Sequence, residues 1–212
     1  TLNRGGIMRH RLALLSCVTT LALILVTAPT RAQDMKPDEE GFIRDWLILG
    51  PFPIAESSGQ DEIDKKQIPE EAAIKPKEGE KQKVGDKEQT WKAVKAKDYH
   101  LDLNEALGGS NEDVVGYIVA YVVCDKAMPD LTMLMGSNDQ GKVYVNGKEV
   151  VKNDTGRSLE KDTDKAEHVN LDKGSNVIVF KVINEKNNWE ACLRFVDKAG
   201  KPVTNYTVKL AP

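Results

Sequence analysis

The sequence predicts an all-β protein built as an antiparallel β-sandwich. Runs rich in β-branched and aromatic residues recur along the chain, and short turns containing Gly or Asn separate them. The helical signal is limited to one turn at 103–107. Eight or so such strands in one chain of this length fit a single two-sheet domain.

The expected strands follow one another with short connections after the first quarter of the chain. Each is an apolar or alternating run of four to eleven residues, bounded by turn-forming residues. They lie at 46–49, 114–124, 131–135, 142–145, 148–151, 167–171, 176–183, 189–196 and 203–210.

The clearest local signal is a β-hairpin at 142–151. Its two strands are joined by Asn146-Gly147. A type I′ turn needs positive φ at both central positions, and Asn and Gly tolerate it best. We therefore expect the chain to reverse at this pair.

The first 32 residues are expected to be an upstream extension followed by a secretory signal peptide. A basic region begins at Met8, an apolar core runs over 12–26, and small residues precede Gln33. The core of about 15 residues is shorter than the roughly 20 needed for a membrane span. Alternatives are an uncleaved anchor and lipidation at Cys17. We expect a secreted or periplasmic protein, with no membrane span after cleavage.

Charge argues against nucleic acid as a partner. The chain has 30 Lys and Arg against 33 Asp and Glu, a net charge of −3. Four of the arginines and none of the acids fall in the first 32 residues, so the rest of the chain is distinctly acidic. An acidic surface disfavours contact with a phosphate backbone.

The mature chain is expected to hold one domain at 45–212, after a linker at 33–44. Half of the residues at 56–89 are charged, and Pro and Gly are scattered among them. This segment is predicted to be a solvated, largely irregular insertion. A docking arm for a protein partner is the alternative.

Two cysteines, Cys124 and Cys192, remain after removal of the leader, in a compartment that permits disulfides. In the chain-entropy model, a disulfide between them would stabilise the folded state by on the order of 4 kcal/mol. Two buried free thiols are the alternative, because Cys packs as a small hydrophobic residue.

No catalytic or metal-binding pattern stands out, so we expect no enzyme and no cofactor. The phosphate-loop spacing at 136–142 leads into a strand, although such a loop needs a helix N-terminus. His100 and His168 are expected to be surface side chains. Asp162 and Asp164 offer oxygen ligands for structural calcium, but the Asp-x-Asp-x-Asp-Gly loop is missing. A solvated acidic loop is the preferred interpretation.

Several segments in order resemble a known module. They are 45–53 (Asp-Trp-Leu-Ile-Leu-Gly-Pro-Phe-Pro), Trp91, 101–103, 120–121, 137–148, 171–181 and 189–194. Together they are similar to the galactose-binding-like jelly-roll module of secreted planctomycete-type bacterial proteins, which is also appended to glycoside hydrolases. The resemblance implies a jelly-roll β-sandwich and a carbohydrate-binding role. Asn138 stands where that module usually has Asp, which weakens any calcium role.

Candidate ligand-binding residues are aromatic and polar side chains near expected turns. Trp189 beside Asn187 is the first choice for a sugar-stacking platform, with Trp91 the second, although a core position is the competing interpretation for Trp189. Asp139 is expected to cap its own turn. The other polar candidates are Arg157 and Asn138.

The leading hypothesis is a non-catalytic binding module with a polysaccharide or glycan ligand. The alternative is a structural or protein-interaction domain of the cell envelope that has no small-molecule ligand. Exposed aromatic residues beside polar loops would favour the first, and a broad apolar patch the second.

Overall fold

The computed structural model describes residues 1–2 and 35–212. The described residues 35–212 belong to one compact unit, to which the following description applies. The expected signal peptide and its cleavage site lie outside the described residues, as does Cys17.

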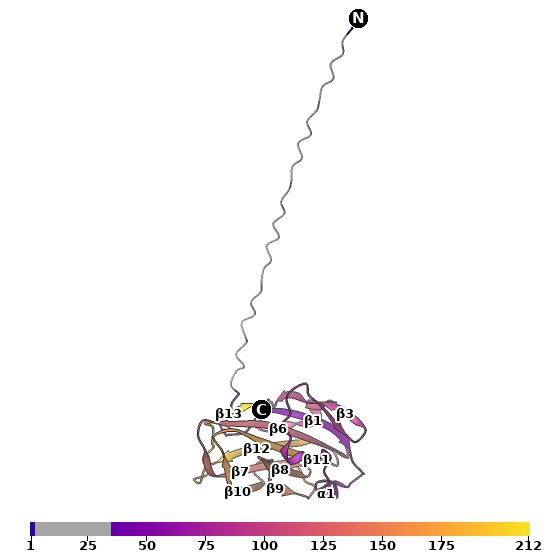
Figure 1. The fold of residues 1–212 in the computed structure, drawn as a ribbon. Coiled ribbons are helices and arrows are strands. Elements are labelled where there is room, and N and C mark those ends of the chain that lie inside the picture. The colour runs from indigo at the N-terminus through magenta and orange to yellow at the C-terminus, as the bar shows by residue number, and fades with distance from the viewer. Residues whose placement is uncertain (3–34) are drawn as a thin grey trace. The chain divides into compact units, whose positions relative to one another are not determined.

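The unit is all-β and antiparallel, as predicted, with two main sheets in a sandwich (Figure 1). The larger sheet has the order β4 (Lys92–Lys95), β1 (Asp45–Pro53), β6 (Val114–Cys124), β11 (Gly174–Asn184), β8 (Gly141–Val145) and β9 (Lys148–Asn153), and β13 (Thr207–Lys209) also pairs with β6. The smaller sheet has the order β10 (Asp164–Leu171), β7 (Met128–Asn138), β12 (Glu190–Val196) and β5 (Leu101–Asp102). A short helix, α2 (Leu103–Leu107), occupies the position of the expected turn.

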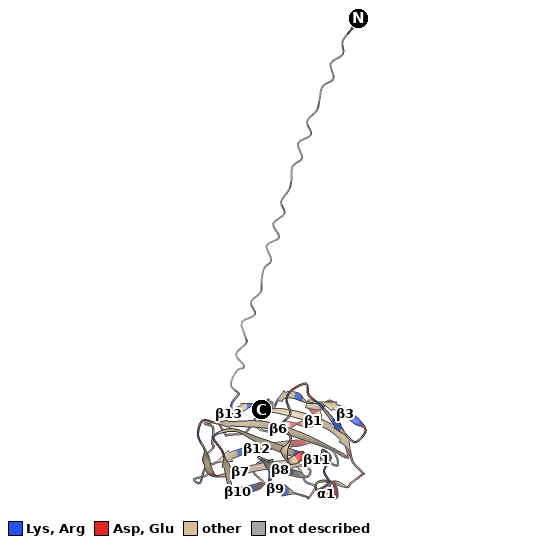
Figure 2. Cartoon of the chain, in the orientation of Figure 1, with Lys and Arg blue, Asp and Glu red and all other residues tan. Residues whose placement is uncertain are grey.

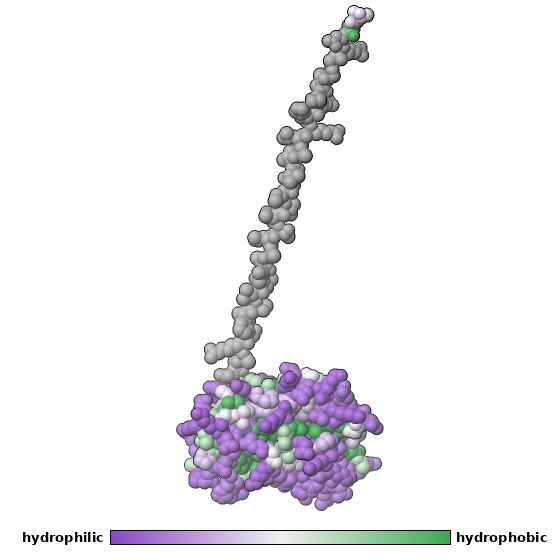
Figure 3. Space-filling model, in the orientation of Figure 1, coloured by the Kyte–Doolittle hydropathy of each residue, from purple (hydrophilic) through white to green (hydrophobic). Residues whose placement is uncertain are grey.

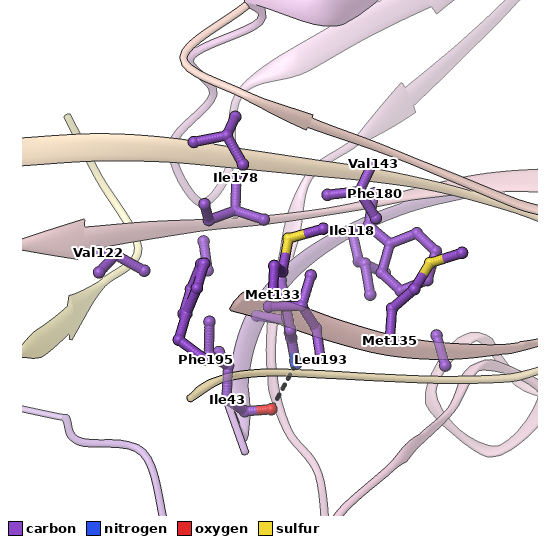
Figure 4. Close-up of a cluster of buried hydrophobic side chains, with 14 of the residues drawn as sticks. Ile43, Ile118, Val122, Met133, Met135, Val143, Ile178, Phe180, Leu193 and Phe195 are labelled. Carbon is purple, nitrogen blue, oxygen red and sulfur yellow. Dashed lines mark hydrogen bonds between the residues drawn. The ribbon is translucent and has the colours of Figure 1, made fainter. Parts of the chain in front are cut away.

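The main hydrophobic core lies between these two sheets. Side chains such as Ile118 and Phe180 from the larger sheet meet Met133, Leu193 and Phe195 from the smaller one (Figure 4). Alternate residues of each strand point into this layer, as the two-residue period of a β-strand requires. The predicted hairpin is confirmed, with φ of 50° at Asn146 and 82° at Gly147.

A buried amide ties this hairpin to the neighbouring turn. Asn176, which is fully buried, accepts hydrogen bonds from the Asp172 backbone N–H and from the Asn146 side chain, both at 2.8 Å. Its own amide donates to the Asp172 carbonyl at 2.8 Å. Asn146 in turn accepts from the Val177 N–H at 2.9 Å. The amide at 176 therefore satisfies backbone groups that no strand partner reaches.

Most residues of the charged insertion are exposed and lie outside helices and strands, as expected, but the segment also packs on the domain through a few buried residues and short regular elements, which was not expected. It contains α1 (Gly59–Glu62), the 3₁₀ turn η1 (Glu71–Ala73) and the hairpin of β2 (Lys81–Val84) and β3 (Lys87–Thr90). Its buried residues Ile63 and Ile68 join a second hydrophobic cluster on the outer face of the larger sheet. The insertion therefore covers that face, and most of its charged residues are exposed. Figure 2 marks the charged residues along the chain.

A buried polar cluster fixes the insertion to the sheet. Glu71 is 1% exposed and accepts hydrogen bonds from the hydroxyls of Tyr117 at 2.6 Å and Tyr144 at 2.9 Å. The Lys181 ammonium, fully buried, lies 3.7 Å from Glu71 and donates to the carbonyls of Glu62 and Ile63. Burial lowers the pKa of Lys181, and the charge of Glu71 opposes that effect. Each buried charge thus has a partner.

The expected linker at 33–44 belongs to the fold from Met35 onward. Met35 pairs with Val208, and Phe42 pairs with Arg194 beside β12. Phe42 and Ile43 are both buried. Because this segment satisfies backbone groups and fills core volume, it is part of the sandwich rather than a connection to it.

We predict that Glu71→Ala destabilises the protein by about 3–5 kcal/mol, because it leaves the Lys181 ammonium buried without its counter-charge. Urea unfolding followed by tryptophan fluorescence measures the change. Glu70→Ala is the matched control, since Glu70 is exposed, and it should shift the free energy of unfolding by less than about 0.5 kcal/mol. Equal effects of the two variants would contradict a buried ionic clamp.

At the hairpin we predict that Gly147→Val lowers the free energy of unfolding by more than about 1 kcal/mol, because a β-branched residue is strained at a φ of 82°. Gly147→Asn is the control, since Asn tolerates positive φ. Thermal unfolding of both variants tests this, and the expectation fails if Val and Asn are tolerated equally.

Candidate functional site

Neither of the tryptophans predicted to stack on a sugar is accessible. Trp189 is fully buried in the inter-sheet core, and Trp91 is 1% exposed beneath the insertion. The Trp189 ring lies against Gly116, where an added Cβ would come within 2.7 Å of it. A buried indole offers no face to a ligand, so the prediction of a tryptophan platform was wrong and the competing core interpretation is correct.

The polar candidates Asp139 and Arg157 are committed to holding loops together. Asp139 accepts hydrogen bonds from the backbone N–H groups of Arg157 at 3.0 Å and Glu185 at 2.8 Å. It therefore joins two distant loops instead of capping its own turn. Arg157 donates to the Ser137 carbonyl at 3.2 Å and forms an ion pair with Asp164. These residues have an architectural role in the structure.

Asn138 and Asn187, the remaining polar candidates, lie in different surroundings. Asn138 ends β7 and is 6% exposed. Asn187 is exposed, and its backbone carbonyl accepts a hydrogen bond from Asn104 at 2.9 Å. The structure therefore does not assemble the predicted residues into one site around an aromatic ring.

Cys124 and Cys192 are both buried free thiols, so the disulfide alternative is wrong. Cys124 lies in the core between the sheets. Cys192 alternates with the core residues Ala191 and Leu193 along β12, so it lies on the outer side of the smaller sheet. There it is covered by the loop at 154–163, whose Glu160 carbonyl would lie 2.2 Å from a Cβ at the neighbouring Gly136. Burial raises the pKa of Cys192 to about 12.

A groove of about 360 Å³ lies at one lateral edge of the sandwich. We call it the first groove. It runs along the connection from β4, an edge strand of the larger sheet, to β5, an edge strand of the smaller sheet, and is closed by α2. Its apolar lining consists of Val94, Ala96, Leu101 and Ala106. Val94 and Ala106 also pack against the main core, so the lining is held by the body of the domain.

Charged side chains surround this lining. Lys97 pairs with Glu105 across the groove, and both side chains are more than half exposed. Asp102 accepts the Glu105 N–H at 2.9 Å and so caps α2. Asp98 accepts the N–H of Tyr99 at 2.7 Å. Each of these aspartates uses one carboxylate oxygen in this way, which leaves its second oxygen as an acceptor for a donor from outside.

His100 supplies a hydrogen-bonding group that the protein leaves unused. Its Nε2 lies 3.5 Å from the Glu190 carboxylate, and its Nδ1 is buried with no hydrogen-bond partner in the described part of the chain. Buried polar atoms are seldom unpaired, because loss of hydration costs free energy. His100 lines the first groove with its ring, while its Nδ1 atom is shielded from solvent.

Sequence reasoning did not find this site. The groove depends on the edges of two sheets that pair through residues far apart in the chain, and β4 and β5 are only four and two residues long. His100 was expected to be a surface side chain, but it is largely buried, whereas His168 is exposed as predicted. The sequence feature that pointed to this region is the expected turn at 103–107, because it places Asp102 at a helix N-cap.

Comparison with known proteins adds no assignment. No protein-family model matches the chain, and no curated protein matches it. Among the residues that the structure describes, no helix is long and apolar enough to span a membrane. The same residues contain no group of three or more His, Cys, Asp or Glu side chains placed to hold a metal ion.

We predict that Cys124 and Cys192 resist a thiol reagent such as Ellman's reagent in the native protein and react fully in guanidinium chloride without added reductant. Both thiols are buried, and a high pKa disfavours the reactive thiolate of Cys192. Mass spectrometry after iodoacetamide treatment of the unfolded protein assigns each site. A pair that reacts only after reduction would contradict the free thiols.

Proposed function

We propose that this chain is an exported, non-catalytic carbohydrate-binding module, and that the first groove is its ligand site. The observation that carries the proposal is the groove itself: an apolar lining, a rim of donors and acceptors, and the imidazole ring of His100 in its wall. Small-molecule sites commonly combine an apolar wall with a few placed polar groups.

The chemistry of the rim fits a neutral polyhydroxylated ligand. Ionised aspartates accept hydrogen bonds and donate none, so Asp98 and Asp102 call for a ligand rich in hydroxyl donors. The lysines at 95 and 97 donate to hydroxyl oxygens. A sugar ring presents C–H groups on its faces and hydroxyls around its edge, which matches an apolar lining with a polar rim. A volume near 360 Å³ is at the small end for ligand pockets and suits a short stretch of a glycan chain.

Both sheet faces are unsuitable for the same role. The insertion covers the outer face of the larger sheet, and the loop at 154–163 crosses the outer face of the smaller one. Hydrophilic residues occupy most of the visible surface of the domain (Figure 3). Within the described residues the exposed large hydrophobic side chains are limited to Leu2. The two lateral edges each hold a recess, and a further recess of about 400 Å³ lies among residues 128–131 and 197–205. Among the described residues there is no broad apolar patch to support the protein-interaction alternative.

The proposal takes its broader context from the sequence. A jelly-roll, galactose-binding-like type of sandwich and export through the leader at 8–32 are part of it, with a secreted or periplasmic location. Without an aromatic platform, we expect millimolar dissociation constants, equivalent to about 4 kcal/mol. Weak single sites are compatible with binding to polysaccharides, which offer many copies of one ligand.

We predict that filling the first groove abolishes glycan binding at that groove. In Ala106→Trp a bulky ring replaces a half-buried lining residue, and the affinity of the first groove for soluble plant or algal oligosaccharides should fall at least tenfold. His100→Ala should weaken binding as well, because it removes a ring from the wall of the groove. Isothermal titration calorimetry across a glycan panel provides the measurement.

Ala199→Trp is the matched control, since it makes the same change at an exposed turn outside the groove. Circular dichroism and thermal unfolding establish that each variant is folded. If the wild-type protein binds none of the glycans, or if the two folded groove variants bind as well as the control, the proposed function is wrong.

A further inference from the structure

We propose a second saccharide site at the opposite lateral edge of the sandwich, which makes the module bivalent. It is a groove of about 510 Å³ between the hairpin β8–β9 and strand β10. We call it the second groove. The ligand class is taken from the proposed function, but the site stands on separate residues and is tested separately.

The sheet orders place the two grooves on opposite sides. β4 and β9 are the two ends of the larger sheet, and β5 and β10 are the two ends of the smaller one. The first groove is lined from β4 and β5, and the second from β9 and β10. Figure 1 shows β9 and β10 together at the lower edge of the domain. One glycan chain therefore cannot fill both grooves without passing around the whole sandwich.

The second groove repeats the composition of the first. Its apolar lining comes from Val145, Val150, Ala166 and Val169. Lys148 and Glu167 stand at the rim, where both are exposed. Asn170 uses its carbonyl oxygen to accept the Asp130 N–H at 2.9 Å, so its amide N–H₂ remains as a donor.

His168 gives this groove the exposed ring that neither tryptophan supplies. Its side chain is 82% exposed, and its Nδ1 lies 2.6 Å from the Asp130 carboxylate. Asp130 is itself held by Lys198 at 2.5 Å. The contact with Asp130 restrains the imidazole, which lines the groove together with the apolar residues. A fixed ring loses little side-chain entropy when a sugar packs on it.

The strand edges exclude an extended peptide as the occupant. In β10 the register shifts between Ala166 and Val169, and His168 has a φ of 61°. In the β8–β9 pair the register shifts between Val143 and Tyr144. Such bulges bend a strand away from regular pairing and protect a free edge from another chain. A ligand held by side chains and shape, such as a saccharide, remains compatible with this groove.

Chemical-shift mapping on ¹⁵N-labelled protein tests the second site directly. The probes are cellohexaose, xylohexaose, mannohexaose and laminarihexaose. We expect one of them to shift amide signals around His168 and Val150 and, as a separate group, those around His100 and Ala106. His168→Asn should remove only the shifts in the second groove, because Asn tolerates the positive φ but carries no ring. Ala106→Trp should remove only the shifts in the first groove.

The two proposals fail in different ways. Shifts confined to the first groove would overturn the second site and leave the proposed function standing. Shifts confined to the second groove would overturn the bivalent arrangement and the placement of the proposed function. No shift with any probe would overturn both.

Bivalence also has its own readout. The wild-type protein should cross-link the polysaccharide corresponding to the bound hexasaccharide, which is detected as turbidity. His168→Asn should still bind that polysaccharide in a pull-down but no longer cross-link it, whereas Ala199→Trp should behave as wild type. Unchanged turbidity with His168→Asn would overturn the bivalent arrangement.

Discussion

The contact between Lys181 and Glu71 is the constraint on which the rest of the structure depends. Lys181 stands in the middle of β11, on the outer face of the larger sheet, with no exposure to solvent. A buried ammonium is tolerated only where other groups replace its hydration. Those groups are the Glu71 carboxylate and the carbonyls that end α1, all of which belong to the insertion. The sheet and the insertion are therefore parts of one folding unit.

The packing of the insertion on the larger sheet limits which parts of the surface are open to a ligand. The insertion converts the outer face of the larger sheet into a second core, with Tyr117 and Tyr144 directed at Glu71 instead of at solvent. The two lateral edges remain open and hold the two grooves. There the strands are short, as at β4 and β5, or bulged, as at β9 and β10. Lys92 and Lys95 further protect the β4 edge from strand pairing. Recesses at the lateral edges thus coexist with strand edges that resist aggregation.

Several residues that look functional in the sequence are architectural in the fold. Asp139 bonds backbone groups from two separate loops, and Asn176 bonds the backbone of its own turn, so both stabilise turns that a sandwich cannot pair within its sheets. A side chain that closes a turn and one that holds a ligand have the same hydrogen-bonding chemistry. The two roles differ only in the groups that the tertiary structure places beside the side chain. A sequence motif alone therefore does not distinguish a turn-closing residue from a ligand-binding one.

The sequence by itself determined the local features: the all-β class, the long strands at 114–124 and 176–183, the turn at Asn146-Gly147 and the short helix beside Asp102. These depend on residue preferences and on alternation within a few positions. The sequence also indicates that the larger sheet is covered on both faces. The eleven residues of β6 include no charged side chain, which is typical of a strand buried on both sides.

Only the tertiary structure decided that the charged insertion packs, that Trp91 and Trp189 are inaccessible, and that the two cysteines lie on different sides of the smaller sheet. The same holds for both grooves. The contacts responsible join residues 40 to 120 positions apart, such as Tyr117 with Glu71 or Lys181 with Glu62. Their free energy depends on burial, which no local pattern specifies: a segment rich in charge on its solvent side needs only a few apolar residues, such as Ile63 and Ile68, to become part of a core.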